Sequence, residues 1–392
     1  MIDAKYKEII NEIDNYAELL WSLSTNLFNN PEIAFKEFKA HKLLTETLGS
    51  HGYHIEEKIG ELDTAFRAKL GDRADHKIAI LAEYDALVGL GHACGHNLIA
   101  SAAVGAGLGL APIIPKLNGQ VQIIGTPAEE GGGGKVILAE AGIFKDIDAA
   151  LMFHPASKNM VLRKSLASCR LTLEFYGKAS HAAAAPEEGI NALDALILTF
   201  NSINAMRSTL LPKDRIAGII KHGGEAANII PAYASAEFSV RALQAKRRDK
   251  LVDRVIACAQ AGAESVGCQL KYELTPGYMD IIPNHVLAGI FQTHLEALGR
   301  VVVDPDPNER MGSTDMGDVS HLVPAIHPYL AIAPINIAGH TEEFKAYSIS
   351  EAGRAAMLDA AKAIAMTTYD LLYEPDLLQK AKEELATELE SP

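Results

Sequence analysis

The sequence predicts an α/β fold with a mostly parallel sheet, helices on both of its faces, and a smaller α+β domain inserted into it. Apolar strand-like segments alternate with helix-like segments through residues 64–153, an order typical of a parallel sheet. Between residues 166 and 277 the order becomes strand–helix–strand–strand–helix–strand, which is typical of a ferredoxin-like domain. We therefore expect a discontinuous first domain, residues 1–165 plus 278–392, and a second domain of residues 166–277.

Periodicity and end signals define the elements of the first domain. Apolar residues at helical spacing predict a helix over residues 6–28, and Pro31 before a further amphipathic run predicts a second helix as far as Leu48. The strand 77–82 is almost wholly apolar after Lys77, as expected where both faces of a strand are covered. The other expected elements are strands 64–70, 121–125, 149–153 and 329–335 and helices 97–110, 135–141, 284–298 and 350–372.

The second domain begins with a segment of strict alternation. Apolar residues occupy every second position of Ser168–Tyr176, which predicts a strand with one buried face. The remaining predicted elements are helices 189–207 and 247–266 and strands 215–222, 232–243 and 268–275.

Composition excludes several classes of function. The chain has 392 residues, enough for two domains, and its net charge of −14 argues against a nucleic-acid partner. Four cysteines are too few for a disulfide framework, which favours a reducing compartment and hence the cytoplasm. The first residues lack the basic start and apolar run of a signal peptide, and no uninterrupted apolar stretch reaches transmembrane length, so we expect no membrane partner.

One short segment, Gly91–Asn97, holds a thiol and an imidazole two residues apart. Cys94 and His96 are side chains that a borderline-soft divalent cation prefers, and the flanking Gly91 and Gly95 allow the backbone to bend around one point. The pair alone is weak evidence, because free cysteines and single histidines are often buried for structural reasons.

Further polar groups follow the ends of predicted strands, where functional residues of parallel sheets gather. These groups are Glu83 to Asp85, Cys94 with His96, Glu129 with Glu130, His154, and His340. Singly, each has a structural explanation, such as a helix cap, but together they favour a metal site at one edge of the sheet.

Two divalent ions at such a site can share a hydroxide and polarise a carbonyl. The adjacent acids Glu129 and Glu130 allow one carboxylate to bind metal while the other transfers a proton. The glycine run before Lys135 lacks the spacing of a phosphate-binding loop, which excludes that alternative.

These segments, in this order, resemble the dinuclear metallo-aminoacylase/carboxypeptidase family (metallopeptidase family 20). They are Glu83-Tyr84-Asp85-Ala86-Leu87, Gly91-His92-Ala93-Cys94-Gly95-His96-Asn97, Pro127-Ala128-Glu129-Glu130, His154-Pro155 and Gly339-His340-Thr341. The sequence is most similar to the amidohydrolase branch, which includes p-aminobenzoyl-glutamate hydrolase and related dipeptidases. The likeness spans most of the chain and implies a zinc-peptidase-like sheet domain with an inserted domain that acts as lid and dimerisation surface.

The resemblance also implies roles for individual residues. The positions matching metal ligands are Cys94, His96, Glu130, His154 and His340, for two divalent ions, Zn²⁺ or Mn²⁺. Glu129 matches the general base, and Asp85 matches the acid that orients the metal site. In the inserted domain, His181 matches an oxyanion-stabilising histidine, often supplied across a dimer, and Asn228 matches a substrate contact. Two further substrate-binding candidates there are Arg241, which could equally be a surface arginine, and His222.

We therefore expect a metal-dependent hydrolase of an amide or peptide bond in small N-acyl amino acids or dipeptides, dimeric through the inserted domain. Val88 and Glu187 depart from the family pattern, which leaves open a metal-stabilised binding protein of the same fold without catalysis. A hydrolase with Cys94 as nucleophile is a third alternative. It has no use for the other candidate ligands together, and a chelator would not inhibit it.

Overall fold

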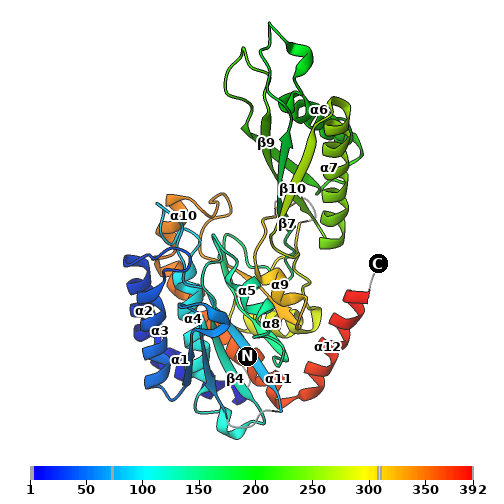
Figure 1. The fold of residues 1–392 in the computed structure, drawn as a ribbon. Coiled ribbons are helices and arrows are strands. Elements are labelled where there is room, and N and C mark those ends of the chain that lie inside the picture. The colour runs from blue at the N-terminus through cyan, green and yellow to red at the C-terminus, as the bar shows by residue number, and fades with distance from the viewer. Residues whose placement is uncertain (1–3, 72–74, 307–308, 310, 391–392) are drawn as a thin grey trace. The chain divides into compact units, whose positions relative to one another are not determined.

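The chain forms two units, each with its own sheet and its own hydrophobic core, in a computed structural model that describes residues 4–71, 75–306, 309 and 311–390 (Figure 1). The first unit comprises residues Met1–Lys164, Ile281–Arg310 and Thr314–Pro392. The second comprises Ser165–Asp280 and Met311–Ser313. Each unit is described by itself below.

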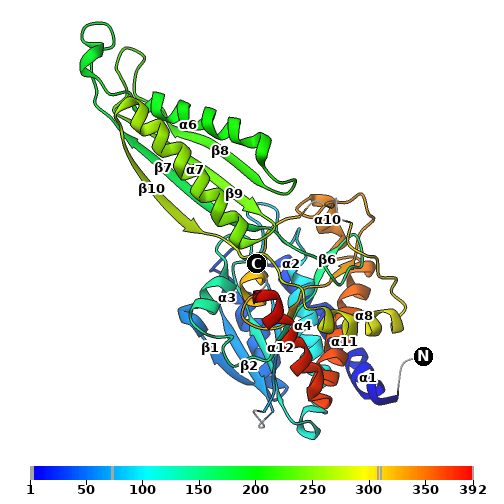
Figure 2. The ribbon, with the colours of Figure 1, turned by 90° about the vertical axis from the view of Figure 1, so that its right-hand side faces the viewer.

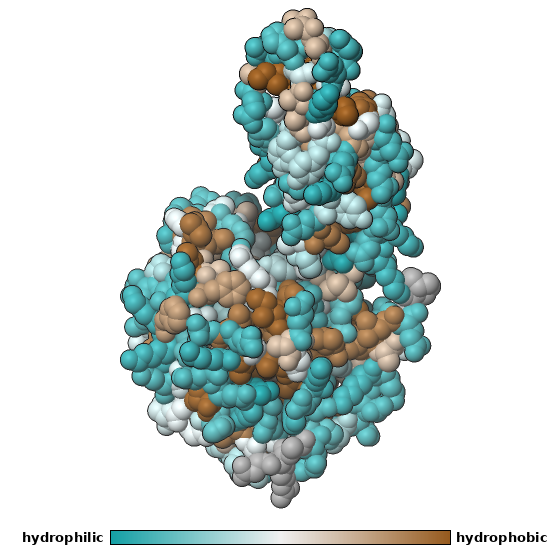
Figure 3. Space-filling view, in the orientation of Figure 1, coloured by the Kyte–Doolittle hydropathy of each residue, from teal (hydrophilic) through white to brown (hydrophobic). Residues whose placement is uncertain are grey.

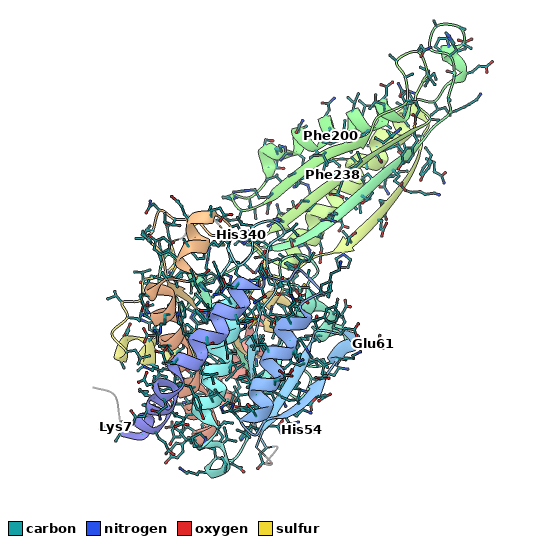
Figure 4. The ribbon with its side chains drawn as sticks, turned by 90° about the vertical axis from the view of Figure 1, so that its left-hand side faces the viewer. Lys7, His54, Glu61, Phe200, Phe238 and His340 are labelled. Carbon is teal, nitrogen blue, oxygen red and sulfur yellow. The ribbon has the colours of Figure 1, made fainter. Side chains whose placement is uncertain are left out.

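The first unit is built on a six-stranded sheet whose strand order is β1-β2-β4-β3-β5-β11. The strands are β1 (His54–Glu57), β2 (Phe66–Leu70), β3 (Lys77–Ala82), β4 (Gln120–Gly125), β5 (Ala149–Leu151) and β11 (Ala325–Ile326). β3 pairs in parallel with β4 and β5, and β11 pairs in parallel with β5. The predicted parallel sheet is confirmed at its centre, but β1 and β2 form an antiparallel edge that the sequence analysis did not foresee. His54 marks this edge in Figure 4.

A separate two-stranded parallel sheet pairs β6 (His154–Ala156) with β12 (Tyr329–Ala331). The predicted strands 149–153 and 329–335 are therefore too long. The chain leaves the main sheet after Leu151, and the His154 amide donates instead to the Pro328 carbonyl at 2.8 Å. This pairing sets Tyr329 opposite His154.

Helix α4 (His96–Leu110) is buried along its whole length and packs against β3 and α11. Two glycines of α4 allow side chains of α1 and α2 to approach its backbone closely. A Cβ on Gly109 would lie 2.5 Å from Cγ1 of Ile13, and one on Gly105 would lie 2.7 Å from Cδ1 of Leu20. The other helices of the unit are α1 (Lys7–Asn15), α2 (Ala17–Asn29), α3 (Phe38–Ser50), α5 (Gly134–Glu140), α8 (His285–Ala297), α9 (Met316–Ser320), α10 (Glu342–Tyr347), α11 (Glu351–Tyr373) and α12 (Pro375–Glu390).

The predicted helix from Pro31 is wrong over its first seven residues, because α3 begins only at Phe38. The intervening segment turns, with Phe35 in the left-handed region at φ 61° and its amide donating to the Glu37 carboxylate at 2.9 Å. The Glu32 carboxylate accepts the amides of Lys39 and Ala40 and so caps α3. A buried acid that accepts backbone amides outweighed the helix-start signal of Pro31.

A buried carboxylate, Asp370 of α11, joins the N-terminal segment to two helices of the core. It accepts hydrogen bonds from the Tyr6 hydroxyl at 2.8 Å and His294 Nε2 at 2.8 Å, and Lys5 Nζ lies 3.3 Å away. Burial opposes ionisation, but the hydrogen bonds from His294 and Tyr6 outweigh it and lower the Asp370 pKa.

We expect Asp370→Asn to lower the free energy of unfolding at pH 7 by about 1–3 kcal/mol, since buried partners lose their charged acceptor. A lowered folded-state pKa stabilises the protein above the unfolded pKa of about 3.9, and this stabilisation is lost as pH falls through the folded value. The variant should therefore show a shallower loss of stability at acid pH than the wild type, measured by urea unfolding at several pH values. If the free energy of unfolding of the variant falls as steeply at acid pH as that of the wild type, this role of Asp370 is contradicted.

The second unit is a four-stranded antiparallel sheet of order β10-β7-β9-β8 covered on one face by two helices (Figure 2). Its elements are β7 (Ala167–Tyr176), α6 (Ala192–Met206), β8 (Arg215–His222), β9 (Tyr233–Ala242), α7 (Ala245–Val266) and β10 (Gln269–Pro276). Phe200 of α6 and Phe238 of β9 meet between helices and sheet with ring centroids 5.0 Å apart (Figure 4). The order confirms the predicted ferredoxin-like arrangement.

The visible surface is mostly hydrophilic, with scattered apolar patches on both units (Figure 3). Among the described residues, no helix combines the length and apolar character needed to cross a bilayer.

Candidate metal centre

Three neighbouring parallel strands deliver their following loops to one edge of the main sheet. Ala82 at the end of β3 pairs with Gly125 at the end of β4, and Ile80 pairs with Leu151 at the end of β5. The loops that follow hold Glu83 to Asp85, Glu129 with Glu130, and His154. The carboxyl-end rule for parallel sheets thus accounts for most of the cluster.

The turn that bears Cys94 depends on a glycine. Gly95 is left-handed at φ 83°, and a Cβ there would lie 2.8 Å from Cγ of Pro155, the residue after His154. His96 is the first residue of the buried helix α4. The thiol and the imidazole are therefore anchored to the core of the unit.

The other four predicted ligand side chains converge around the Cys94 sulfur. Sγ lies 3.3 Å from His154 Nε2 and 3.3 Å from His340 Nε2. Glu130 Oε1 lies 3.4 Å from His340 Nε2 and 3.9 Å from His96 Nε2. His340 stands on the loop before α10 (Figure 4).

The ligand atoms form overlapping groups, within each of which every atom lies within 4.8 Å of the others. One group is Cys94, His96 and His154, and a second is Cys94, Glu130 and His340. A third joins His96 with Glu129 and Glu130. The residues of these groups would suit divalent cations, because thiolate, imidazole and carboxylate side chains are their common ligands.

Buried polar atoms without a hydrogen-bond partner indicate whether a cation fits this cluster. Among the described residues, His96 Nε2, Glu130 Oε1 and Glu83 Oε2 are buried without a hydrogen-bond partner. Unsatisfied buried polar atoms are costly, so such a set requires a partner. The donor set of thiol, imidazole and carboxylate fits a divalent transition metal ion.

Contacts at the Nδ1 atoms of His96 and His154 orient the two imidazole rings. His96 Nδ1 lies 2.9 Å from the Asp85 carbonyl and 3.1 Å from Asp85 Oδ1, both acceptors, so Nδ1 carries a proton and Nε2 is the nitrogen that could bind a metal ion. His154 Nδ1 likewise lies 2.7 Å from the Pro155 carbonyl. Asp85 Oδ2 accepts the Glu130 amide at 2.9 Å, so Asp85 holds two parts of the cluster together.

The electrostatics of the site favour added positive charge. Burial raises the pKa of the Cys94 thiol above its ordinary value. Burial also raises the pKa of Glu129, with the charges of Glu83 and Asp315 acting in the same direction. For His96, burial lowers the pKa, but the charges of Asp85 and Glu83 outweigh it and raise the pKa well above the ordinary value. Cation binding must therefore displace protons from the cluster.

The loop bearing Glu129 is tightly fixed. Ala128 is left-handed at φ 63°, its amide donates to Glu37 Oε1 at 3.0 Å, and its carbonyl accepts the Gly133 amide at 2.8 Å. This backbone fixes the positions of Glu129 and Glu130, each of which places a carboxylate oxygen within 4.8 Å of His96 and of the other.

Sequence reasoning gave no role to several side chains around the cluster. Tyr329 stacks on His154 with ring centroids 5.1 Å apart, and the Arg163 guanidinium lies 4.2 Å from the Tyr329 ring centre. The ring of buried His327 lies 5.3 Å from that of His154. The sequence offered one clue to these side chains. His327 and Tyr329 lie at the predicted strand that precedes the loop of His340.

Lys135 and Asp315 were also missed as neighbours of the cluster, and both are fully buried. Lys135 was considered only as part of a phosphate-binding loop. Asp315 precedes α9, a helix that no predicted element anticipated.

The four predicted residues of the inserted domain lie in the second unit. His181 and Asn228 are neighbours, since the Ala182 amide donates to the Asn228 carbonyl at 3.0 Å. His181 Nδ1 accepts the amides of Ala183 and Ala184, which leaves the ring proton on Nε2.

The other two residues of that set have partners of their own. His222 Nε2 lies 3.1 Å from Glu225 Oε1, and Arg241 donates to the Ser313 hydroxyl at 3.3 Å. His222 and Arg241 both belong to the sheet of this unit, on β8 and β9.

Comparisons with known proteins agree with this architecture. Residues 161–266 match the peptidase dimerisation domain. The Xaa-Arg dipeptidases of Mus musculus and Homo sapiens are 39% and 37% identical, and each alignment covers 96% of this chain and 91% of the relative. A p-aminobenzoyl-glutamate hydrolase polypeptide of Escherichia coli (strain K12) is 26% identical over 97% of this chain and 94% of its own length.

A solved Bacillus subtilis protein described as a dinuclear metal binding peptidase from the M20 family has a similar fold, with a TM-score of 0.74, 19% identity, and coverage of 92% of this chain and 99% of that chain. The identity to the dipeptidases extends over nearly the whole chain, well beyond the dimerisation domain. The chain therefore belongs to the M20 peptidase family, whose members hydrolyse carbon–nitrogen bonds of amides and peptides.

Proposed function

We propose that the protein is a metal-dependent dipeptidase or amidohydrolase that cleaves the amide bond of dipeptides or small N-acyl amino acids. The observation that supports this most is the Cys94 sulfur shared by two ligand groups, with Glu129 in a third group beside them. The names of the two Xaa-Arg dipeptidases make dipeptides with a C-terminal arginine the first substrates to test.

The chain's own residues would hold two divalent ions through Cys94, His96, Glu130, His154 and His340. The thiol and imidazoles favour Zn²⁺, and the carboxylate and imidazoles also suit Mn²⁺. When bound, such ions lower the pKa of water and polarise the substrate carbonyl.

Glu129 is the proposed general base. Its carboxylate takes a proton from the attacking water and returns it to the leaving nitrogen. Burial, with the charges of Glu83 and Asp315, raises the pKa of Glu129, which favours uptake of the proton by this carboxylate. Asp85 acts through His96 and the Glu130 amide, whose positions it fixes.

In the second unit, His181 is the proposed oxyanion donor, because its Nε2–H is left available by the hydrogen bonds at Nδ1. We assign substrate contacts to Asn228, Arg241 and His222. We propose a homodimer formed through this unit, since β8, at one edge of its sheet, exposes Ile219 (58%) and Ile220 (48%). The four cysteines are free thiols, which fits the cytoplasm as the working compartment.

Metal removal and a substrate panel test the proposal. The panel comprises Xaa-Arg dipeptides, β-alanyl dipeptides, N-acyl amino acids and p-aminobenzoyl-glutamate, each assayed with added Zn²⁺ or Mn²⁺. We expect hydrolysis of at least one class, loss of at least about 100-fold in rate after chelation, and recovery when metal is restored. Hydrolysis that survives complete metal removal would instead support Cys94 as nucleophile. Metal binding without hydrolysis of any substrate would support a binding protein.

A further inference from the structure

The least expected side chain near the candidate metal centre is the buried ammonium of Lys135, on the first turn of α5. Its Nζ donates to Glu83 Oε1 at 2.5 Å and to Asp315 Oδ1 at 2.8 Å, and its backbone amide donates to Asp315 Oδ2 at 3.0 Å. All three side chains are at most 1% exposed. A charge buried to this degree is retained only when its partners satisfy it, as they do here.

Glu83 connects this ammonium to a predicted metal ligand. Its Oε1 accepts from Lys135, and its Oε2 lies 3.4 Å from His96 Nε2. Among the described residues, Oε2 has no hydrogen-bond partner although it is buried. One rigid carboxylate thus spans the distance from the ammonium to the ligand nitrogen of His96.

Lys135 also anchors the far end of the loop that holds Glu129. The near end is held by Glu37 at the Ala128 amide and by Asp85 at the Glu130 amide. The loop then closes tightly on itself, because a Cβ on Gly134 would lie 1.9 Å from the Pro127 carbonyl oxygen. Directly after this closure, Asp315 fixes both the amide and the ammonium of Lys135.

We propose that Lys135 is a positioning residue for the reaction. Its ammonium holds the Glu83 carboxylate against His96 and fixes the end of the loop that presents Glu129. This role rests on the proposed hydrolytic function. Without the ammonium, the charges of Glu83 and Asp315 lose their shared cation, and their mutual repulsion displaces the carboxylate beside His96 and the start of α5.

The test compares Lys135→Met and Glu83→Gln with the wild type. Lys135→Met removes the charge at similar length, whereas Glu83→Gln leaves the Lys135–Asp315 pair intact and neutralises only the carboxylate that faces His96. We expect each variant to lose about 10–100-fold in kcat, as contacts behind a ligand do, while KM stays within about threefold. Lys77→Met is the matched control. It lies at the other end of β3, pairs with the exposed Asp146, and should leave kcat unchanged.

The double variant Lys135→Met/Glu83→Gln separates positioning from general stabilisation. If Lys135 acts through Glu83, the two losses in kcat overlap, and the double variant is about as slow as the slower single variant. Losses that multiply, or a wild-type kcat in Glu83→Gln, would overturn the proposal. Glu83→Gln retains the buried ion pair, so it decides the question even where Lys135→Met fails to fold.

Two further readouts do not depend on turnover. In metal-free protein, amide hydrogens of residues 128–135 should exchange faster in Lys135→Met than in Lys77→Met. Competition with a chelating dye should show Zn²⁺ binding about 10–100-fold weaker in Glu83→Gln. If the wild type hydrolyses nothing in the panel, the proposed function fails, yet these readouts still test the positioning role. Unchanged exchange together with unchanged Zn²⁺ affinity would refute it.

Discussion

Glu129→Gln is expected to lose on the order of 10²–10⁴-fold in kcat while it keeps its metal content. The amide preserves the size of the side chain but cannot accept the proton of the attacking water. The loop stays in place, because its anchors are the Ala128 and Glu130 amides, which the substitution does not touch. Steady-state kinetics and metal analysis of the same preparation measure both parts of the prediction.

Glu140→Gln provides the matched control, since Glu140 is the exposed last residue of α5, the helix that follows the same loop. It should retain wild-type kcat. Near-normal turnover by Glu129→Gln would exclude Glu129 as the general base. Loss of metal from that variant would show that Glu129 binds an ion, with the proton transferred by another group.

Cys94→Ser is expected to weaken metal binding by at least about 100-fold, because contacts one step behind a ligand already contribute 10–100-fold. The Cys94 sulfur is 3.3 Å from both His154 Nε2 and His340 Nε2, so its replacement affects two ligand groups together. A hydroxyl is a poorer ligand than a thiolate for a borderline-soft cation. Metal content after dialysis against a chelator measures the loss.

Cys258→Ser is the control for this experiment, since Cys258 is a half-buried free thiol on α7 of the other unit. It should keep wild-type metal content and stability. Equal metal retention by Cys94→Ser and Cys258→Ser would remove Cys94 from the ligand set.

Local sequence patterns predicted those parts of the fold in which a single segment decides its own structure. The apolar run of β3 predicted its bounds, Lys77–Ala82, because burial on both faces leaves an unbroken apolar signal. The helix from Pro31 was wrong because the Glu37 carboxylate, which also accepts bonds from Thr64 and the Ala128 amide, holds the segment in a turn. Such distant partners leave no periodic trace in the sequence.

The candidate site shows the same division. That Cys94 and His96 lie together was predictable because they are close in sequence and flanked by glycines. The strand-end rule together with the family resemblance suggested the other residues of the cluster. The contact between Lys135 and Asp315 was not predictable, since 180 residues separate them and neither belongs to a ligand motif. Their pairing arises only when α5 and α9 meet. Long-range ion pairs of this kind require the fold to be known.

Two of the candidate ligand groups share Cys94, and the complete burial of α4 makes them differ in how easily one of their side chains can move away. His96 is continuous with a helix that lies wholly inside the core, so withdrawing it means disturbing the packing against Ile13 and Leu20. His340, by contrast, belongs to a loop, and its side chain is 54% exposed. Moving the His340 imidazole away from the cluster therefore disrupts few packing contacts. If these residues hold two ions as proposed, we expect the ions to enter and leave on the His340 side and the two positions to exchange radioactive zinc at different rates.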